Sequence, residues 1–316
     1  MNNGQIICYD SAGAERTIET PNLDSWLKNK GVMQRGKFKS YIFSKLQGSQ
    51  NRSNWFMTCN YRDFTDHDLT KTYYMPICGV KEQPPVGRLI RYVEWLGFSE
   101  EDLVGEGFNN TIFGTGYVHG HESVYKDCSE LLDILNRHKI TCGHGIDSRQ
   151  TDIVCRVMNA IWDTQIYDSC ARIVILLEDS EADSMELLRQ VYLLMPSQLR
   201  LQMGFMTNVS ASDIMQIGDR DGMAVYVMTA NRSSWSTICE YNYSFHVYPL
   251  DVSNILAYNF REQKLLLLEN LADMTSDPDR LKQFDAIEAD VLKKHETTVP
   301  SFRYYEEMLE RMNLMA

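Results

Sequence analysis

The chain has 316 residues, a formal net charge of −12 and a hydrophobic content of 44%. This length suits two domains, the composition is that of an ordinary soluble globular protein, and no apolar run reaches the roughly 18 residues of a membrane-spanning helix. The acidic balance argues against a general nucleic-acid-binding protein, because contact with phosphate groups needs positive charge.

The N-terminus, MNNGQIICYD, lacks the basic region and long apolar stretch of a secretory signal. Eight cysteines are scattered along the chain without a CxxC pair. Free thiols are typical of reducing compartments, so we expect a cytoplasmic protein with reduced cysteines.

The N-terminal part is predicted to be rich in strands, because runs of β-branched and aromatic residues are bounded by Gly, Asn, Asp or Pro. The expected strands are Gln5–Tyr9, Phe38–Leu46, Asn54–Tyr61, Thr72–Ile77 and Thr111–Val118. Short helices are expected over Leu23–Asn29 and Val86–Leu96, the second preceded by two prolines and followed by Gly97. Ser99–Asp102 fits a helix capping box.

The middle of the chain alternates helical and strand patterns. Helices are predicted over Glu122–Arg137, Ser148–Asp163 and Ser180–Met195, with Pro196 ending the third. Strands are predicted over Ala171–Leu177, Met203–Val209, Met223–Thr229 and Tyr241–Tyr248. Alternation of this kind is typical of α/β folds.

The last third is predicted to be helical. The expected helices are Asp251–Phe260, Lys264–Met274, one that starts at Ser276 and ends near His295, and one from Ser301 to about Met315. The predicted fold class is therefore α/β or mixed α+β. Residues 1–140 are expected to form a strand-rich N-terminal domain, residues 141–250 an α/β middle domain, and residues 251–316 a helical segment packed on the middle domain.

Histidines and a cysteine form the densest group of metal-binding residue types. His119 and His121 are two residues apart, as are Cys142 and His144. Four such ligands would suit a tetrahedral zinc ion, with Glu122 as a base, although the spacing matches no standard zinc motif. Glycine-rich turns with locally bonded histidines are the competing interpretation.

Positive charge gathers in one stretch near the N-terminus. Between Ser25 and Asn54 the basic residues are Lys28, Lys30, Arg35, Lys37, Lys39, Lys45 and Arg52, and this stretch has no acidic residue. One hypothesis is a binding surface for phosphate or nucleic acid that uses Lys28, Lys37, Lys39 and Arg52. The other is a solvated face that acidic neighbours balance.

The segment Leu187–Val209 resembles the middle region of the GTPase-associated protein family of bacterial NTP-dependent conflict systems. The residues that carry the resemblance are Pro196, Leu199, Arg200, Phe205 and Thr207. Met195 stands where that family usually has leucine. The resemblance implies a non-enzymatic companion of an NTPase, and it carries over no catalytic residue. On physical grounds Pro196 should stop a helix, and Arg200 is expected to cap main-chain carbonyls or to bind a carboxylate.

Three functions follow as hypotheses. The first is a non-enzymatic adaptor or sensor module that binds a protein partner, an NTPase by the resemblance, without a cofactor and through an exposed apolar or Met-rich surface. The second is a metal-dependent hydrolase that uses His119, His121, Glu122 and His144. The third is a nucleic-acid or phospholigand binder that uses the stretch 28–52.

Overall fold

The structure is a computed structural model that describes residues 5–11, 14–19, 53–58, 73–82, 90–96, 98–99, 148–167, 171–177, 181–216, 223–241, 246–251, 278–295 and 302–312. The predicted elements that lie wholly outside these residues are Leu23–Asn29, Phe38–Leu46, Thr111–Val118, Glu122–Arg137 and Lys264–Met274.

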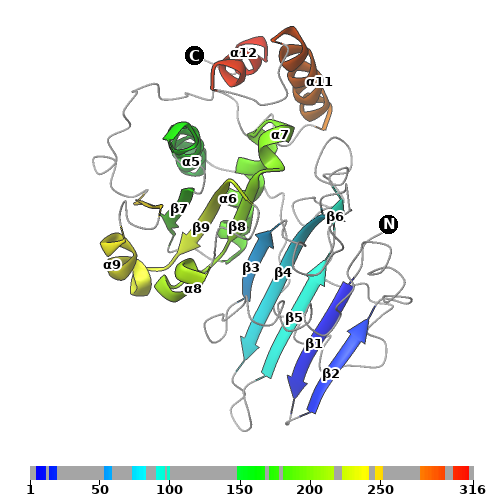
Figure 1. Cartoon of the computed structure of the whole chain (residues 1–316), viewed down its shortest axis with the longest axis vertical. Helices are drawn as coiled ribbons and strands as arrows, with labels where there is room; N and C mark the ends of the chain where they lie inside the picture. Colours follow the sequence, from blue (N-terminus) through cyan, green and yellow to red (C-terminus); the bar gives the residue numbers. More distant parts are fainter. Residues whose placement is uncertain are drawn as a thin grey trace.

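The described strands form one sheet in the order β10-β7-β9-β8-β3-β4-β5-β1-β2 (Figure 1). Its first part is parallel and consists of β10 (Val247–Leu250), β7 (Ala171–Leu176), β9 (Val225–Ala230) and β8 (Met203–Met206). Its second part is antiparallel and consists of β3 (Ser53–Thr58), β4 (Tyr73–Glu82), β5 (Ile90–Leu96), β1 (Gln5–Ser11) and β2 (Ala14–Glu19), with β6 (Phe98–Ser99) beside β4.

One antiparallel contact joins the two parts of the sheet. Phe56 of β3 lies opposite Met206 of β8, and Met57 lies opposite Phe205. The sheet therefore continues across the boundary that the sequence predicts near residue 140.

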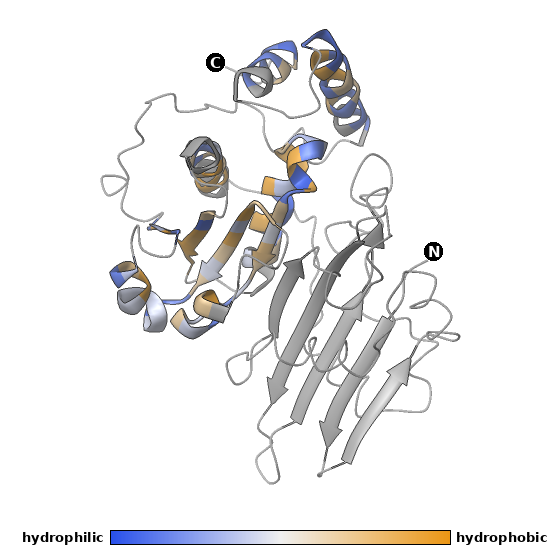
Figure 2. Ribbon diagram, viewed as in Figure 1, coloured by the Kyte–Doolittle hydropathy of each residue, from blue (hydrophilic) through white to orange (hydrophobic). Residues whose placement is uncertain are grey.

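The parallel strands form the centre of the described core. All residues of β7, β8 and β9 are buried, as expected for parallel strands that are covered on both faces. Apolar colour is accordingly concentrated on these strands, whereas the C-terminal helices carry much polar colour (Figure 2). The described part after residue 153 thus combines helices with a parallel sheet, which confirms the predicted α/β character of that part.

Helices connect the parallel strands. Helix α5 (Ser148–Tyr167) precedes β7, and α6 (Glu181–Leu194) with the short α7 (Ser197–Arg200) leads from β7 to β8. Helix α8 (Ala211–Gln216) leads to β9, and α9 (Arg232–Glu240) leads to β10. Helices α11 (Pro278–Lys294) and α12 (Phe302–Arg311) pack on each other at the α7 end of the molecule, away from α8 and α9 (Figure 1).

The predicted helix over Val86–Leu96 is wrong, because residues 90–96 form β5. The sequence IRYVEWL is rich in β-branched and aromatic residues, and both edges of this strand are paired, with β1 and with β4. Ser99, the first residue of the predicted capping box, lies in β6 opposite Tyr73, and residues 100–102 lie outside the described residues. The prolines before the segment Val86–Leu96 and the glycine after it indicate where an element begins and ends, but they do not distinguish a helix from a strand.

The predicted strand over Tyr241–Tyr248 is also placed wrongly. Tyr241 closes α9 in a right-handed helical conformation, and the strand runs from Val247 to Leu250. Within it, Pro249 fits a strand at the end of the sheet order, because proline cannot donate a hydrogen bond to a neighbour. Asp251, the first residue of the helix predicted over Asp251–Phe260, is not helical, and residues 252–260 lie outside the described residues.

Phe205 gives a direct test of this core. Its side chain is fully buried and makes an edge-to-face contact with Tyr192, with ring centroids 6.0 Å apart. We expect Phe205→Ala to lower the free energy of unfolding by about 3–5 kcal/mol, because the deletion leaves a cavity. Met215→Ala, at a side chain that is 45% exposed, is the control and should change it by less than about 0.5 kcal/mol. Equal losses in urea denaturation would contradict this description of the core.

Candidate functional site

The sequence-predicted site residues divide into two groups. The histidine and cysteine cluster, with Glu122, and the basic residues Lys28, Lys37, Lys39 and Arg52 lie outside the described residues. The residues that carry the family resemblance are all described, and three of them, Pro196, Leu199 and Arg200, lie at a break between two helices.

That break separates α6 from α7. Helix α6 ends at Leu194, and Pro196 follows with φ −52° and ψ 144°, which is an extended conformation. Proline fits the position before a new helix but has no side chain that can cap it. The break lies in the interior, because Leu194, Met195 and Pro196 are all buried. Its main-chain polar groups therefore need partners from elsewhere in the protein.

Arg200 supplies the donors for the carbonyl groups at the end of α6. Its Nε donates to the carbonyl oxygen of Met195 at 2.8 Å, and its Nη2 donates to that of Leu193 at 3.3 Å. Nη2 also lies 3.3 Å from Oδ1 of Asp285 on α11. The side chain is almost fully buried. Arg200 thus makes both of the contacts that the sequence offers as alternatives, to main-chain carbonyls and to a carboxylate.

Glu288 supplies the acceptor for the first amide groups of α7. Its Oε2 accepts from the main-chain N–H of Ser197 at 2.8 Å, and its Oε1 accepts from that of Gln198 at 3.4 Å. Glu288 is only 3% exposed and lies 91 residues after Ser197. We call this group, Arg200 of α7 with Asp285 and Glu288 of α11, the α7 junction. A carboxylate at a helix N-terminus is stabilised by both the hydrogen bonds and the helix dipole.

The other residues of the resemblance belong to the core. Leu199, Phe205 and Thr207 are buried at 1%, 0% and 0% exposure. The hydroxyl of Tyr192 donates to the carbonyl oxygen of Met203 at 2.7 Å and so fixes α6 to the start of β8. This segment acts by supporting the fold.

Polar residues gather at the carboxyl ends of β8 and β9, the edge where open α/β sheets commonly bind ligands. Asn208 has a positive φ of 51°, and its N–H donates to Oγ1 of Thr229. The N–H of Ser210 donates to Oδ2 of Asp213, and the N–H of Asp213 donates back to Oγ of Ser210, so this pair caps α8. These groups are therefore occupied in holding the turn and the helix start.

Helix α6 carries a buried cluster of charged and polar side chains. The carboxylate of Glu186 accepts from Nε and Nη2 of Arg189, at 2.8 Å for the shortest contact, and from Nε2 of Gln190 at 2.6 Å. Glu186 and Gln190 are fully buried, and Arg189 is 5% exposed. Among the described residues, Oε1 of Gln190 has no hydrogen-bond partner. Arg189 neutralises the buried carboxylate, and this pairing is what makes its burial tolerable.

Methionines fill the described core and do not form a contact surface. Nine are buried, namely Met158, Met185, Met195, Met203, Met206, Met223, Met228, Met308 and Met312. Met215 is the one large hydrophobic side chain that is exposed among the described residues. The predicted apolar or Met-rich contact surface is therefore not found in this part of the chain.

The exposed surface of the C-terminal pair α11–α12 is charged. Glu307 of α12 accepts from Nζ of Lys294 at 2.7 Å and from Nη2 of Arg311 at 2.8 Å, and its Oε2 lies 3.0 Å from Nε2 of His295. Arg311 also contacts Asp290 of α11 at 2.5 Å. Hydrogen bonds from Lys294 and His295 lower the pKa of Glu307 to about 2, and hydrogen bonds to Asp290 and Glu307 raise the pKa of Arg311. These hydrogen bonds join the C-terminal end of α11 to α12.

The remaining features concern metals, thiols and membranes. Within the described residues, no group of three or more His, Cys, Asp or Glu side chains is placed to hold a metal ion. Cys155 is buried and Cys239 exposed, and neither is in a disulfide. Partial desolvation of its sulfur, followed by the charge of Asp251, raises the pKa of the Cys239 thiol although the residue is exposed. None of the described helices is both long enough and apolar enough to cross a membrane.

Comparison of the chain with protein-family models, with curated proteins and with solved structures finds no match.

Arg200→Lys tests the importance of the guanidinium group. We expect it to lower the free energy of unfolding by about 1.5–3 kcal/mol, because one ammonium group cannot reproduce the donors that Arg200 gives to Leu193, Met195 and Asp285. The control is Lys293→Arg at an exposed position of α11, the same exchange in the opposite direction, which should change it by less than about 0.5 kcal/mol. Equal effects of the two substitutions in urea denaturation would contradict the proposed role of Arg200.

Glu307→Gln tests the charged group on the C-terminal pair. The folded-state pKa of Glu307 lies near 2, below its ordinary value of 4.5, so its stabilisation is complete above about pH 4.5 and is lost as the pH falls towards 2. The melting temperature of the variant should therefore lie below that of the native protein at about pH 7, and the difference should shrink at about pH 3. A difference that is the same at both pH values would exclude this effect.

Proposed function

We propose that the protein is a non-enzymatic interaction module, an adaptor or sensor, that binds a protein partner through its C-terminal pair α11–α12. The observation that carries the proposal is the α7 junction. It fixes α11 to the parallel-sheet part through buried charged groups, while the opposite side of α11 faces solvent. A binding element that is held rigidly by its own protein loses little conformational freedom when the partner binds.

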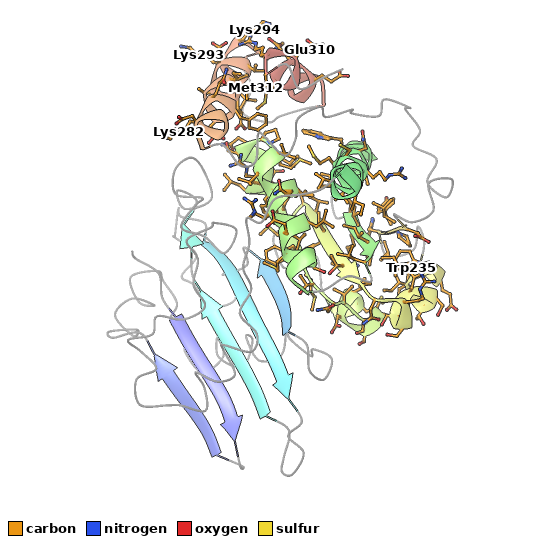
Figure 3. All side chains as sticks on the ribbon, turned by 180° about the vertical axis from the view of Figure 1, so that it is seen from behind. Trp235, Lys282, Lys293, Lys294, Glu310 and Met312 are labelled. Carbon is orange, nitrogen blue, oxygen red and sulfur yellow. The ribbon has the colours of Figure 1, made fainter. Side chains whose placement is uncertain are left out.

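The surface of α11 supports this proposal. Phe284, Glu288 and Val291 form the buried side of the helix, at the spacing of one helical face. The exposed residues include Asp279, Lys282, Gln283, Ala286, Ala289, Asp290, Lys293 and Lys294. Lys282, Lys293 and Lys294 lie at the α11–α12 end of the molecule, with Glu310 of α12 nearby and Trp235 of α9 at the other end (Figure 3). A polar surface suits an interface that forms and dissociates.

The carboxyl edge of the parallel strands adds indirect support. The hydrogen bonds of Asn208, Thr229, Ser210 and Asp213 hold the turn after β8 and the start of α8. The side chains of Thr229, Ser210 and Asp213 are therefore used for structure, whereas an enzyme of this architecture commonly presents reactive groups at this edge.

The resemblance to the GTPase-associated protein family suggests the class of partner. It favours an NTPase of a bacterial conflict system, with this chain as the companion that senses or adapts. Arg200, one of the residues that carry the resemblance, contacts Asp285 of α11 and so links the resembling segment to the proposed binding surface.

Affinity purification from the native host tests the proposal. The tagged protein is isolated in the native form, as Lys282→Gln/Lys293→Gln, and as Ser236→Glu/Thr237→Glu. Co-purifying proteins are then quantified by mass spectrometry, and zinc by elemental analysis. Both double variants lower the net charge by two, one on α11 and the other on the exposed side of α9, so they form a matched pair.

The native protein and the α9 variant should recover a stoichiometric NTPase, and the α11 variant should recover at least several-fold less. Loss of the partner only in the α9 variant would contradict the proposed surface. Stoichiometric zinc without a protein partner would contradict the adaptor function and favour the hydrolase that uses His119, His121, Glu122 and His144.

A further inference from the structure

Helix α7 is too short to be stable by itself. It has four residues, Ser197–Arg200, and an isolated helix of this length cannot offset the cost of forming its first turn. Its order must therefore come from groups outside it.

All four main-chain N–H groups of α7 have a hydrogen-bond acceptor. The N–H groups of Leu199 and Arg200 donate to the carbonyl oxygen of Pro196. The helix has no side-chain cap of its own. The N–H groups of Ser197 and Gln198 donate instead to the carboxylate of Glu288. The first turn of α7 thus depends on a residue of α11 that is remote in sequence.

The end of α7 leads directly into the central sheet. Leu201 and Gln202 are bonded back to Ser197 and Leu199, and the carbonyl oxygen of Gln202 accepts from Ala224 and Val225. Met203, the next residue, begins β8. This strand pairs with β9 on one side and with β3 on the other, so it is the link between the parallel and the antiparallel parts of the sheet.

We propose that α7 is a coupling element that is ordered only while α11 is docked, and that it transmits the docking of the C-terminal pair to the start of β8. When α11 moves away, Ser197 and Gln198 lose their acceptor, and Arg200 loses the carboxylate of Asp285. The helix break then has uncapped amide groups, and the turn before β8 loosens. This coupling operates within the chain, with or without a bound partner.

Hydrogen–deuterium exchange of the full chain tests the coupling. The variants are Glu288→Ala, Glu288→Gln and the control Asp290→Ala, which removes a carboxylate of α11 that contacts only α12 among the contacts described above. In Glu288→Ala the amides of residues 197–203 should exchange about tenfold faster or more, since a hydrogen bond to a charged group is lost. Glu288→Gln keeps one acceptor and should accelerate them several-fold.

The control separates local coupling from general loss of stability. Asp290→Ala should accelerate exchange in α12 and leave residues 197–203 unchanged, and β7 should be unchanged in every variant. Unchanged exchange over residues 197–203 in Glu288→Gln would overturn the proposal, even if Glu288→Ala fails to fold. Equal acceleration of β7 and α7 would also overturn it, because it would indicate global unfolding.

Discussion

Pro196 breaks a helix inside the protein, and the partners of the groups exposed by this break organise the described structure. The carbonyl oxygens at the end of α6 are bonded by Arg200, and the first amides of α7 are bonded by Glu288. One partner is local and the other comes from α11. Because buried main-chain groups without partners destabilise a fold, α11 is held at this end of the molecule by the same contacts that complete α7.

The charges at this junction differ from those on the surface of the C-terminal pair. Arg200 and Glu288 are buried and bonded to main-chain groups, so salt screens them little. Lys294, Arg311 and Glu307 are partly or largely exposed, and interactions of this kind contribute modestly. The contacts of the α7 junction should therefore depend less on ionic strength than the charged contacts between α11 and α12.

The sequence predicted the parts of this arrangement that depend on neighbours along the chain. Local patterns predict the buried strand β7 and the end of α6 before Pro196. They also predict that Arg200 bonds to main-chain carbonyls or to a carboxylate. Glu288 could not be paired with Ser197 in this way, since 91 residues separate them. The sequence does indicate that Glu288 is buried and needs a partner, because it occupies the same helical face as Phe284 and Val291, where an apolar residue is expected. Helix α9 was missed for another reason: it is rich in Ser and Thr, and Ile238 is its one residue classed as buried. The candidate zinc and phosphate sites lie outside the described residues and stay predictions.

Arg200 and Glu288 act as one unit on the two sides of α7. A double-mutant cycle with Arg200→Met and Glu288→Gln, followed by urea denaturation, measures this most directly. Groups that share a partner element should be coupled, so the two losses should depart from additivity by more than about 0.5 kcal/mol. Additive losses would contradict the account, because they would mean that α7 is held by two independent contacts.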